Sequence, residues 1–207
     1  MTSKLDYKKE YKDLYLPPKK PVTITVPPIS FIMLDGKGDP NSREYQNAVS
    51  ALYSLSFTIK MSKMGSEKID GYFEYVVPPL EGLWSSDGPF DFNKRDKWTW
   101  TSMIRQPEFV TEDVFQWAVE SVHRKKPEVD VSKVEFVRFD EGMCVQMMHI
   151  GPYATEPATV EIMQQYMEEN GLIDVTGDIR RHHEIYLSDP RKTKPENLKT
   201  VLRHPVE

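Results

Sequence analysis

The chain has 207 residues, of which 39% are hydrophobic and 29% charged, so it can bury a sizeable core and is not expected to be disordered. Its net charge is −5 and it carries no long basic run, which argues against nucleic acid as a partner. No apolar stretch approaches the roughly 20 residues that cross a bilayer, so no membrane association is expected.

Residues 1–21 predict an N-terminal arm or short helix laid over the main domain, which spans residues 22–207. The arm is charged and carries several tyrosines, and it has no apolar core of the kind found in signal peptides. The single cysteine, Cys144, excludes an intrachain disulfide framework and fits a reducing compartment. Together these features predict a cytoplasmic protein.

The first half of the domain predicts a strand, a helix and two further strands. Residues 22–34 favour a strand that Pro27 and Pro28 bend or place at a sheet edge, and residues 36–40 form a turn. Asn41 is then expected to cap a helix, with Glu44 as its capping-box partner. Strands follow at residues 72–77 and 98–104, separated by a loop over residues 78–97 that contains Trp84.

The second half begins with a helix capped by Thr111 and stopped by Pro127. Strands are predicted at residues 134–139 and 143–150, joined as a hairpin by the turn at residues 140–142. Cys144 lies in the second of these apolar runs and is interpreted as a core residue rather than a nucleophile. A helix over residues 156–169 and a strand over residues 181–187 complete the pattern.

The order strand, turn, helix, strand occurs twice, in halves at about residues 22–110 and 130–207. Within them, residues 98–107 are matched to residues 181–190, because each is a short strand closed by a polar residue and proline. The sequence therefore predicts an α+β fold in which two pseudo-symmetric βαββ modules form an antiparallel sheet around a central cleft. Such a seam is a common position for a ligand.

The last predicted strand carries an unusual set of polar side chains. Alternation places His182, Glu184 and Tyr186 on one face, and His183 on the other with Ile185 and Leu187. A carboxylate in the middle of a strand is costly to bury without a partner. Two interpretations remain open: a binding or reaction site, and an ordinary solvated face of the sheet.

Aromatic residues suggest what such a site would bind. Trp98 and Trp100 share one strand face, Trp84 lies in a predicted loop, and Tyr153 follows a Gly-Pro turn. Aromatic side chains beside a carboxylate favour flat apolar or cationic ligands through stacking and cation–π attraction. The alternative is that the tryptophans belong to an ordinary core.

Other chemistries have weaker support. His182 and His183 are adjacent, so on a strand they point to opposite faces and cannot both bind one metal ion, and no metal-binding spacing is present. No nucleophile elbow surrounds Cys144 or any serine. The glycines Gly36 and Gly38 lack the spacing of a phosphate-binding loop. Neither a metal nor a cofactor is expected.

Two short motifs resemble the GyrI-like small-molecule-binding family, which includes effector domains of multidrug-responsive transcription regulators of the BmrR type. They are HIGPY at residues 149–153, before a helix, and HEIYL at residues 183–187. The resemblance extends over about residues 22–207. It implies paired βαββ modules around a cleft, with Glu184 meeting polar or cationic ligand groups inside an aromatic pocket. No helix-turn-helix precedes residue 22, so a stand-alone member is expected.

Residues 36–40, 98–100 and 103–107 look more like one subgroup, whose members hydrolyse the cyclopropyl ring of cyclopropanoid DNA-alkylating compounds. This resemblance implies a detoxifying hydrolase with Glu184 and Tyr186 as catalytic residues. The ligand-binding residues expected from the aromatic pattern and the strand are Trp84, Trp98, Trp100, Tyr153 and His182. The alternative is a module that binds or sequesters small molecules without turnover, and a protein partner follows only from the family's namesake.

Overall fold

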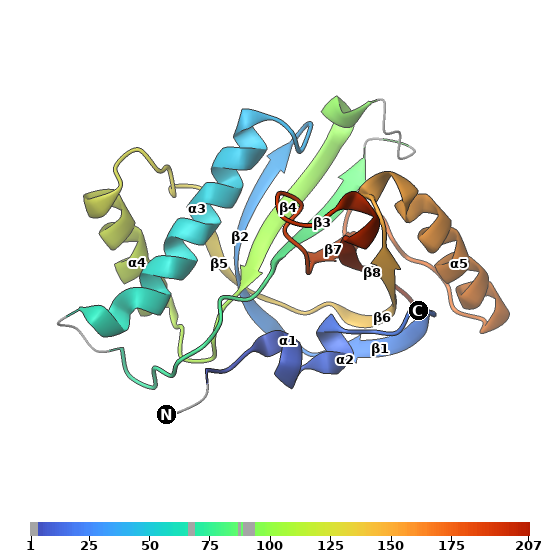
Figure 1. Ribbon diagram of the computed structural model, residues 1–207, viewed down its shortest axis with the longest axis horizontal. Helices are drawn as coiled ribbons and strands as arrows, with labels where there is room; N and C mark the ends of the chain where they lie inside the picture. The colour runs from blue at the N-terminus through green and yellow to red at the C-terminus, as the bar shows by residue number, and fades with distance from the viewer. Residues whose placement is uncertain (1–3, 66–68, 87, 89–93) are drawn as a thin grey trace.

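The computed structural model describes residues 4–65, 69–86, 88 and 94–207 (Figure 1). In these segments eight strands form one antiparallel sheet in the order β1-β6-β8-β7-β3-β4-β2-β5. The strands are β1 (Val22–Val26), β2 (Ile29–Lys37), β3 (Leu80–Ser86), β4 (Trp98–Arg105), β5 (Glu135–Phe139), β6 (Gly142–Ile150), β7 (His182–Tyr186) and β8 (Lys199–Pro205). The α-helices are α1 (Tyr7–Glu10), α2 (Lys12–Tyr15), α3 (Arg43–Lys60), α4 (Glu112–Lys125) and α5 (Glu156–Glu169).

Two βαββ modules build this sheet, which confirms the predicted α+β class and the internal repeat. The first is β2-α3-β3-β4 and the second is β6-α5-β7-β8. They meet where β3 pairs with β7, with Gly82 opposite Glu184. β5 extends the sheet beyond β2, and β1 extends it beyond β6. The predicted polar strand therefore lies at the junction of the modules.

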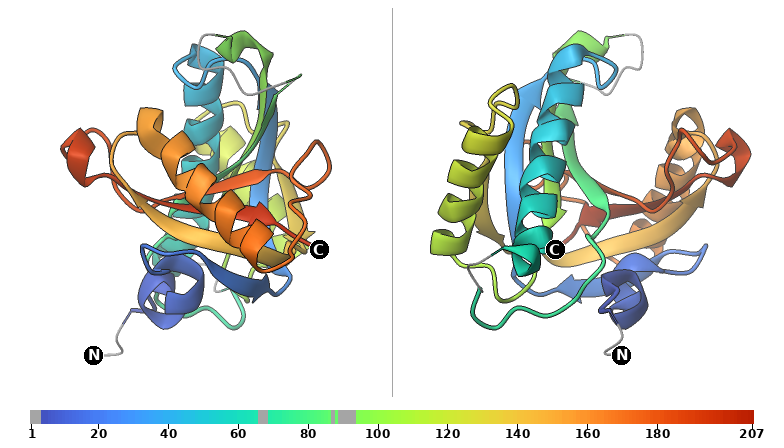
Figure 2. Two further views of the ribbon diagram at one scale, coloured as in Figure 1. Left: turned by 90° about the vertical axis from the view of Figure 1, so that its right-hand side faces the viewer. Right: turned by 60° about the vertical axis from the view of Figure 1, so that its left-hand side comes forward.

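The two faces of the sheet near this junction have different coverings (Figure 2). α3 packs against Ile32 and Ile104 of the first module. α5 packs through Met163 and Met167 on the second module. Both helices cover the face that carries Glu184. The N-terminal helices cover the opposite face, where Tyr15 donates a hydrogen bond to Glu81.

The N-terminal segment packs closely against the body. Tyr7, Leu14 and Tyr15 are buried. The Arg105 guanidinium lies 4.3 Å from the centre of the Tyr7 ring, so a cation–π contact joins the segment to β4. No helix in the described ranges combines the length and apolarity needed to cross a membrane.

One of the predicted repeat equivalences is wrong. β7 occupies the position that β3 has in the first module, and β4 corresponds to β8, so residues 98–107 do not match residues 181–190. β8 was not expected because Lys199, Arg203 and His204 obscure its apolar alternation. In the structure the Arg203 guanidinium is paired with Glu141, which makes the burial of this strand possible.

The expected strand at residues 72–77 is also wrong. That segment is irregular, with an isolated bridge between Leu5 and Tyr75. The strand lies instead at residues 80–86, inside the predicted loop, and residues 87 and 89–93 of that loop lie outside the described residues. Gly82 and two serines weaken the sequence signal of β3, but pairing with β4 on one side and β7 on the other stabilises it.

Three local predictions need correction as well. The run at residues 22–34 is two strands, because Pro27 and Pro28 break it and send β1 and β2 to different modules. β5 and β6 do not form a hairpin: β5 pairs with β2, whereas β6 pairs with β1 and β8. The cap of α3 is Ser42 rather than Asn41, since the Ser42 hydroxyl accepts from the Tyr45 amide.

Candidate active site

Glu184 is held from both sides by side chains of its own strand. The Tyr186 hydroxyl donates to Glu184 Oε2 over 2.7 Å, and His182 Nε2 lies 3.2 Å from Glu184 Oε1. The side chains of His182 and Glu184 are each 14% exposed. The predicted alternation is thus correct for this strand. The face that carries Glu184 is not an ordinary solvated face, because the carboxylate is largely shielded and both its oxygens have partners.

A tryptophan from the other module completes this contact. Trp84 Nε1 donates to the Tyr186 hydroxyl over 2.9 Å, which leaves that hydroxyl's proton to face Glu184. The hydrogen bond crosses the β3–β7 junction. The expectation that Trp84 lies exposed in a loop is wrong, because it belongs to β3 and is 5% exposed.

The three tryptophans form one packed cluster with Ala48 of α3. Trp98 is 5% exposed and Trp100 is 1% exposed, and the Trp84 and Trp98 rings meet edge to face at 5.9 Å. The aromatic groups that remain half-buried are Tyr45, Tyr153 and Tyr186. Tyr45 and Tyr186 pack against the tryptophan cluster and are more exposed than its indoles.

Glycine makes room for two of the indoles. A Cβ atom on Gly82 would lie 2.7 Å from Trp84 Nε1, and one on Gly36 would lie 2.2 Å from the Trp100 ring. Neither glycine has the left-handed backbone conformation that glycine favours. Their contribution is the absence of a side chain, which leaves room for the Trp84 indole over its own strand β3 and for the Trp100 indole against the neighbouring strand β2.

Tyr45 and Tyr153 border Glu184 from the helical side. The Tyr45 ring stacks on Trp84 at 5.9 Å, and the Tyr153 ring meets Tyr186 edge to face at the same distance. Burial raises the pKa of each to about 12. Burial, followed by the charge of Glu184, also raises the pKa of Tyr186 well above its usual value. All three phenols are therefore protonated hydrogen-bond donors at neutral pH.

A second carboxyl group, which sequence reasoning missed, lies beside Glu184. Glu156 is the first residue of α5 and is 6% exposed. Burial raises its pKa well above the usual value, and the neighbouring charge of Glu184 raises it further. Glu156 Oε1 has no hydrogen-bond partner in the described part of the chain. In the pair formed by Glu156 and Glu184, the raised pKa of Glu156 favours its protonated form.

Two further residues extend the site through His182. His182 Nδ1 lies 2.8 Å from His204 Nε2, and His204 Nδ1 lies 2.9 Å from Asp174 Oδ2. Tyr45, Glu156, His204 and Asp174 were not predicted. Each comes from a different element from Glu184, and a single sequence carries no signal of those contacts.

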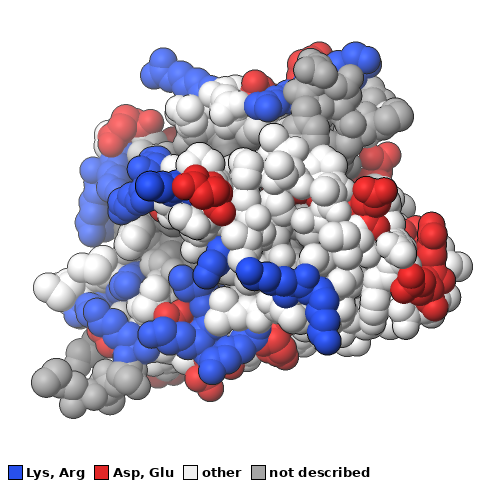
Figure 3. All heavy atoms as spheres, turned by 45° about the vertical axis from the view of Figure 1, so that its right-hand side comes forward, with Lys and Arg blue, Asp and Glu red and all other residues white. Residues whose placement is uncertain are grey.

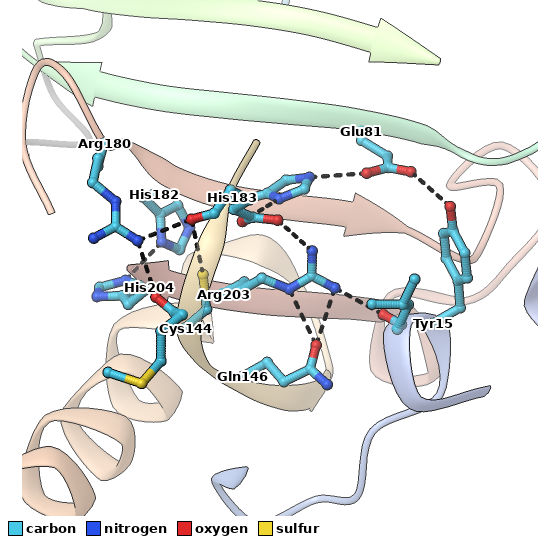
Figure 4. Close-up of polar contacts among 12 residues, drawn as sticks. Tyr15, Glu81, Cys144, Gln146, Arg180, His182, His183, Arg203 and His204 are labelled. Atoms are coloured by element: carbon cyan, nitrogen blue, oxygen red, sulfur yellow. Dashed lines mark hydrogen bonds and ion pairs between the residues drawn. The ribbon is translucent and has the colours of Figure 1, made fainter. Parts of the chain in front are cut away.

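His183 faces away from Glu184, as the alternation predicts, into a buried ionic cluster (Figure 4). His183 Nδ1 lies 2.8 Å from Glu141 and its Nε2 lies 3.0 Å from Glu81, while Arg203 contacts Glu141 at 2.6 Å. Although burial opposes charge, these partners raise the pKa of His183 to about 9 and lower that of Glu141 to about 2. The cluster is internally paired and is a structural feature.

Cys144 is a core residue, as predicted. It is fully buried, and burial together with the Glu141 charge raises the pKa of its thiol to about 12, so no thiolate nucleophile forms there. Within residues 4–65, 69–86, 88 and 94–207, no group of three or more His, Cys, Asp or Glu side chains is placed to hold a metal ion.

Charged side chains are mixed on the face shown in Figure 3. Lys and Arg gather at the left and also run across the lower part of this face. Asp and Glu lie in smaller groups among them and at the right, and a broad area near the centre has no charged side chains.

Comparison with known proteins places the chain in a family. The model of the GyrI-like small molecule binding domain matches residues 19–207. An uncharacterized conserved protein from Listeria innocua is 59% identical, covers 99% of this chain and 100% of its own, and has a TM-score of 0.96. A hydrolase encoded by lin2189 from Listeria innocua is 57% identical over 99% of this chain and 100% of its own, with a TM-score of 0.94.

More distant structures share the fold alone. The C-terminal domain of EcmrR is 11% identical, covers 91% of this chain and 97% of its own, and has a TM-score of 0.55. No curated protein matches the sequence. Because the family model spans nearly the whole chain, this protein belongs to the family of GyrI-like small-molecule-binding domains.

Proposed function

We propose that this protein is a hydrolase that opens the cyclopropyl ring of cyclopropanoid DNA-alkylating compounds. The observation that carries the proposal is the geometry of Glu184, a shielded carboxylate whose two oxygens are oriented by His182 and Tyr186. Two Listeria innocua structures that are 57% identical to this chain are named hydrolases, which supports the reaction class. The cyclopropanoid substrate is what the resemblance of residues 36–40, 98–100 and 103–107 to the hydrolysing subgroup implies.

The reaction requires a base, an acid and a dry site. A cyclopropane fused to a conjugated ketone is strained, so water attacks its methylene carbon, a ring C–C bond breaks and the electron pair moves to the carbonyl oxygen. Glu184 takes the proton of the attacking water. Glu156, kept protonated by its raised pKa, is the neighbouring group that supplies a proton to the developing oxyanion.

The aromatic residues position the flat substrate. Tyr45, Tyr153 and Tyr186 provide the half-buried surface against which its rings pack. Trp84, Trp98 and Trp100 form the rigid wall behind them, and Trp84 fixes the Tyr186 hydroxyl. Closing the substrate between these rings excludes bulk water from the reacting carbon, which strengthens the electrostatic contribution of Glu184.

The proposal is tested by incubating the purified protein with a cyclopropanoid in water that carries a heavy oxygen isotope. Mass spectrometry should find a ring-opened product with one added water and the isotope at the former methylene carbon. The uncatalysed reaction in buffer alone is the control. If the compound, supplied in excess over the protein, is recovered intact, hydrolysis is contradicted.

A second candidate function is binding without turnover. It is favoured by the family itself, since GyrI-like domains bind small molecules, and by the carboxylate among phenol rings, which suits a cationic ligand equally well. In the same experiment this function gives intact compound bound in stoichiometric amount. Equilibrium dialysis against the unreacted compound measures that binding directly.

A further inference from the structure

A line of hydrogen-bonded side chains leads away from Glu184. It runs from Glu184 Oε1 to His182 over 3.2 Å, from His182 to His204 over 2.8 Å, and from His204 to Asp174 over 2.9 Å. Figure 4 shows the His182 and His204 rings next to each other on β7 and β8. The His204 side chain is 7% exposed and that of Asp174 is 26% exposed. The line therefore links a shielded carboxylate to one that water reaches.

The contacts determine where the protons on this line lie. Asp174 also accepts the Thr176 amide, and its pKa is lowered to about 2, partly by its bond to His204. As a carboxylate it can only accept, so His204 Nδ1 carries a proton. Burial lowers the pKa of His204, which keeps the ring neutral and leaves Nε2 as an acceptor. His182 Nδ1 must then donate to His204.

This order leaves His182 Nε2 facing Glu184 Oε1. Two bare lone pairs at 3.2 Å would repel each other, so a proton lies between these atoms. When Glu184 is ionised, that proton belongs to His182, which is then an imidazolium. The protonation of Glu184 is thereby linked to the protonation of His182 and His204.

We infer that Asp174, His204 and His182 form a proton relay that serves Glu184 during turnover. The inference rests on the proposed function. When Glu184 takes a proton from water, the His182 imidazolium loses its carboxylate partner. Its Nδ1 proton moves to His204 Nε2, and the His204 Nδ1 proton moves to Asp174 Oδ2. Each ring gains and loses one proton at most. Asp174 holds the proton only transiently, because its pKa is lowered to about 2. Once Glu184 has passed its own proton to the ionised Glu156, the same transfers run in reverse and reset the line.

Other titratable groups around the line do not interrupt it. Glu156 from α5 faces Glu184, as do Tyr45 from α3, Tyr153 and Tyr186, and burial raises the pKa of all four. These groups stay neutral near pH 7, so at this end the contact that bears on the line is the one between His182 Nε2 and Glu184 Oε1. At the other end, Asp174 and His182 are the charged groups that bear on His204.

The decisive variant is Asp174→Asn, which removes the carboxylate that orients His204 while keeping its size. We expect kcat for ring opening to fall at least about tenfold, as when the group that fixes a histidine tautomer is removed. The pH profile of kcat should shift while KM stays nearly unchanged. His204→Gln should give the same pattern. His123→Gln, which changes an exposed histidine of α4, is the matched control and should match the wild type.

Nitrogen NMR of the histidine rings tests the relay without any substrate. In the wild type, His204 should carry its proton on Nδ1 with Nε2 bare, and His182 should carry a proton on Nδ1. Asp174→Asn should change the His204 tautomer. If the protons lie as expected but the protein does not open the ring, the proposed function is overturned, whereas the order of hydrogen bonds is retained. Observation of protonated Nε2 with bare Nδ1 on His204, or an unchanged kcat profile in active Asp174→Asn protein, would overturn the relay.

Discussion

Gly82 shows how a single missing side chain shapes the site. It lies opposite Glu184 across the module junction, and the Trp84 indole occupies the space where a Cβ atom would be. The hydrogen bonds from Trp84 to Tyr186 and from Tyr186 to Glu184 depend on that close approach. The orientation of the carboxylate is therefore set partly by a residue that makes no polar contact itself.

Substituting Gly82→Ala should displace the Trp84 indole and break its bond to Tyr186. Overpacking of this kind costs about 1–3 kcal/mol of unfolding free energy. We expect a lower Tm. The fractional fall in the ring-opening rate should exceed the fractional loss of folded protein. Gly177→Ala is the control, because a Cβ atom there meets nothing within 4 Å. Equal effects of the two substitutions would show that the Gly82 contact is unimportant.

At this scale the sequence predicts some of the site and not the rest. Alternation along one strand is enough to group His182, Glu184 and Tyr186, because their spacing is fixed by the backbone. Glu156, His204 and Asp174 reach the site from α5, from β8 and from the segment before β7, so only the fold brings them together. The depth of the tryptophans likewise depends on the helix that covers them.

Among the elements, the back of β7 is held by the buried cluster of Glu81, His183, Glu141 and Arg203. These residues come from β3, β7, the turn before β6, and β8, so the cluster joins the two modules below the site. Replacing any one partner leaves an uncompensated buried charge, which is strongly destabilising. The cluster fixes the strand whose other face presents Glu184.

The cluster predicts how stability depends on pH. His183 has a pKa raised to about 9, so the stability it contributes is complete below its usual value of 6.5 and is lost as the pH rises towards 9. Glu141 has a pKa lowered to about 2, so its contribution is complete above its usual value of 4.5 and is lost as the pH falls towards 2. Unfolding free energy should therefore be highest between these limits.

Urea unfolding at a series of pH values measures this dependence. The decline above neutral pH should be reduced in His183→Gln protein, which is less stable overall but lacks the titrating ring. The exposed His123→Gln variant should follow the wild-type curve. A wild-type curve that keeps rising through pH 9 would contradict the assignment of a charged His183.

Two elements show why the strand predictions were incomplete. β3 contains a glycine and two serines, and β8 contains Lys199, Arg203 and His204, so neither has the apolar alternation of an ordinary strand. Both are stabilised by partners on each side and by polar contacts with other elements. The helices α4 and α5, whose caps and stops are local, could be placed from sequence almost to the residue.

For the whole molecule, the repeat explains where the site lies. The first module supplies Trp84 and Tyr45, and the second supplies Glu184, Tyr186 and Glu156. Neither module alone holds both Glu184 and the tryptophan that bonds to the Tyr186 hydroxyl beside it. The presence of two βαββ modules could be inferred from the sequence, whereas the register of β3 against β7, which aligns Gly82 with Glu184, could not.

The proposed ring opening depends most directly on Glu184 as the base. Glu184→Gln keeps the size and hydrogen-bonding shape of the side chain but removes its ability to take a proton, and Glu161→Gln, on the exposed side of α5, is the matched control. Single-turnover ring opening and the dissociation constant of a ring-opened product analogue should be measured for both. We predict unchanged binding and a rate lowered about 10²–10⁴-fold in Glu184→Gln alone. A folded Glu184→Gln protein that opens the ring at the wild-type rate would contradict the account.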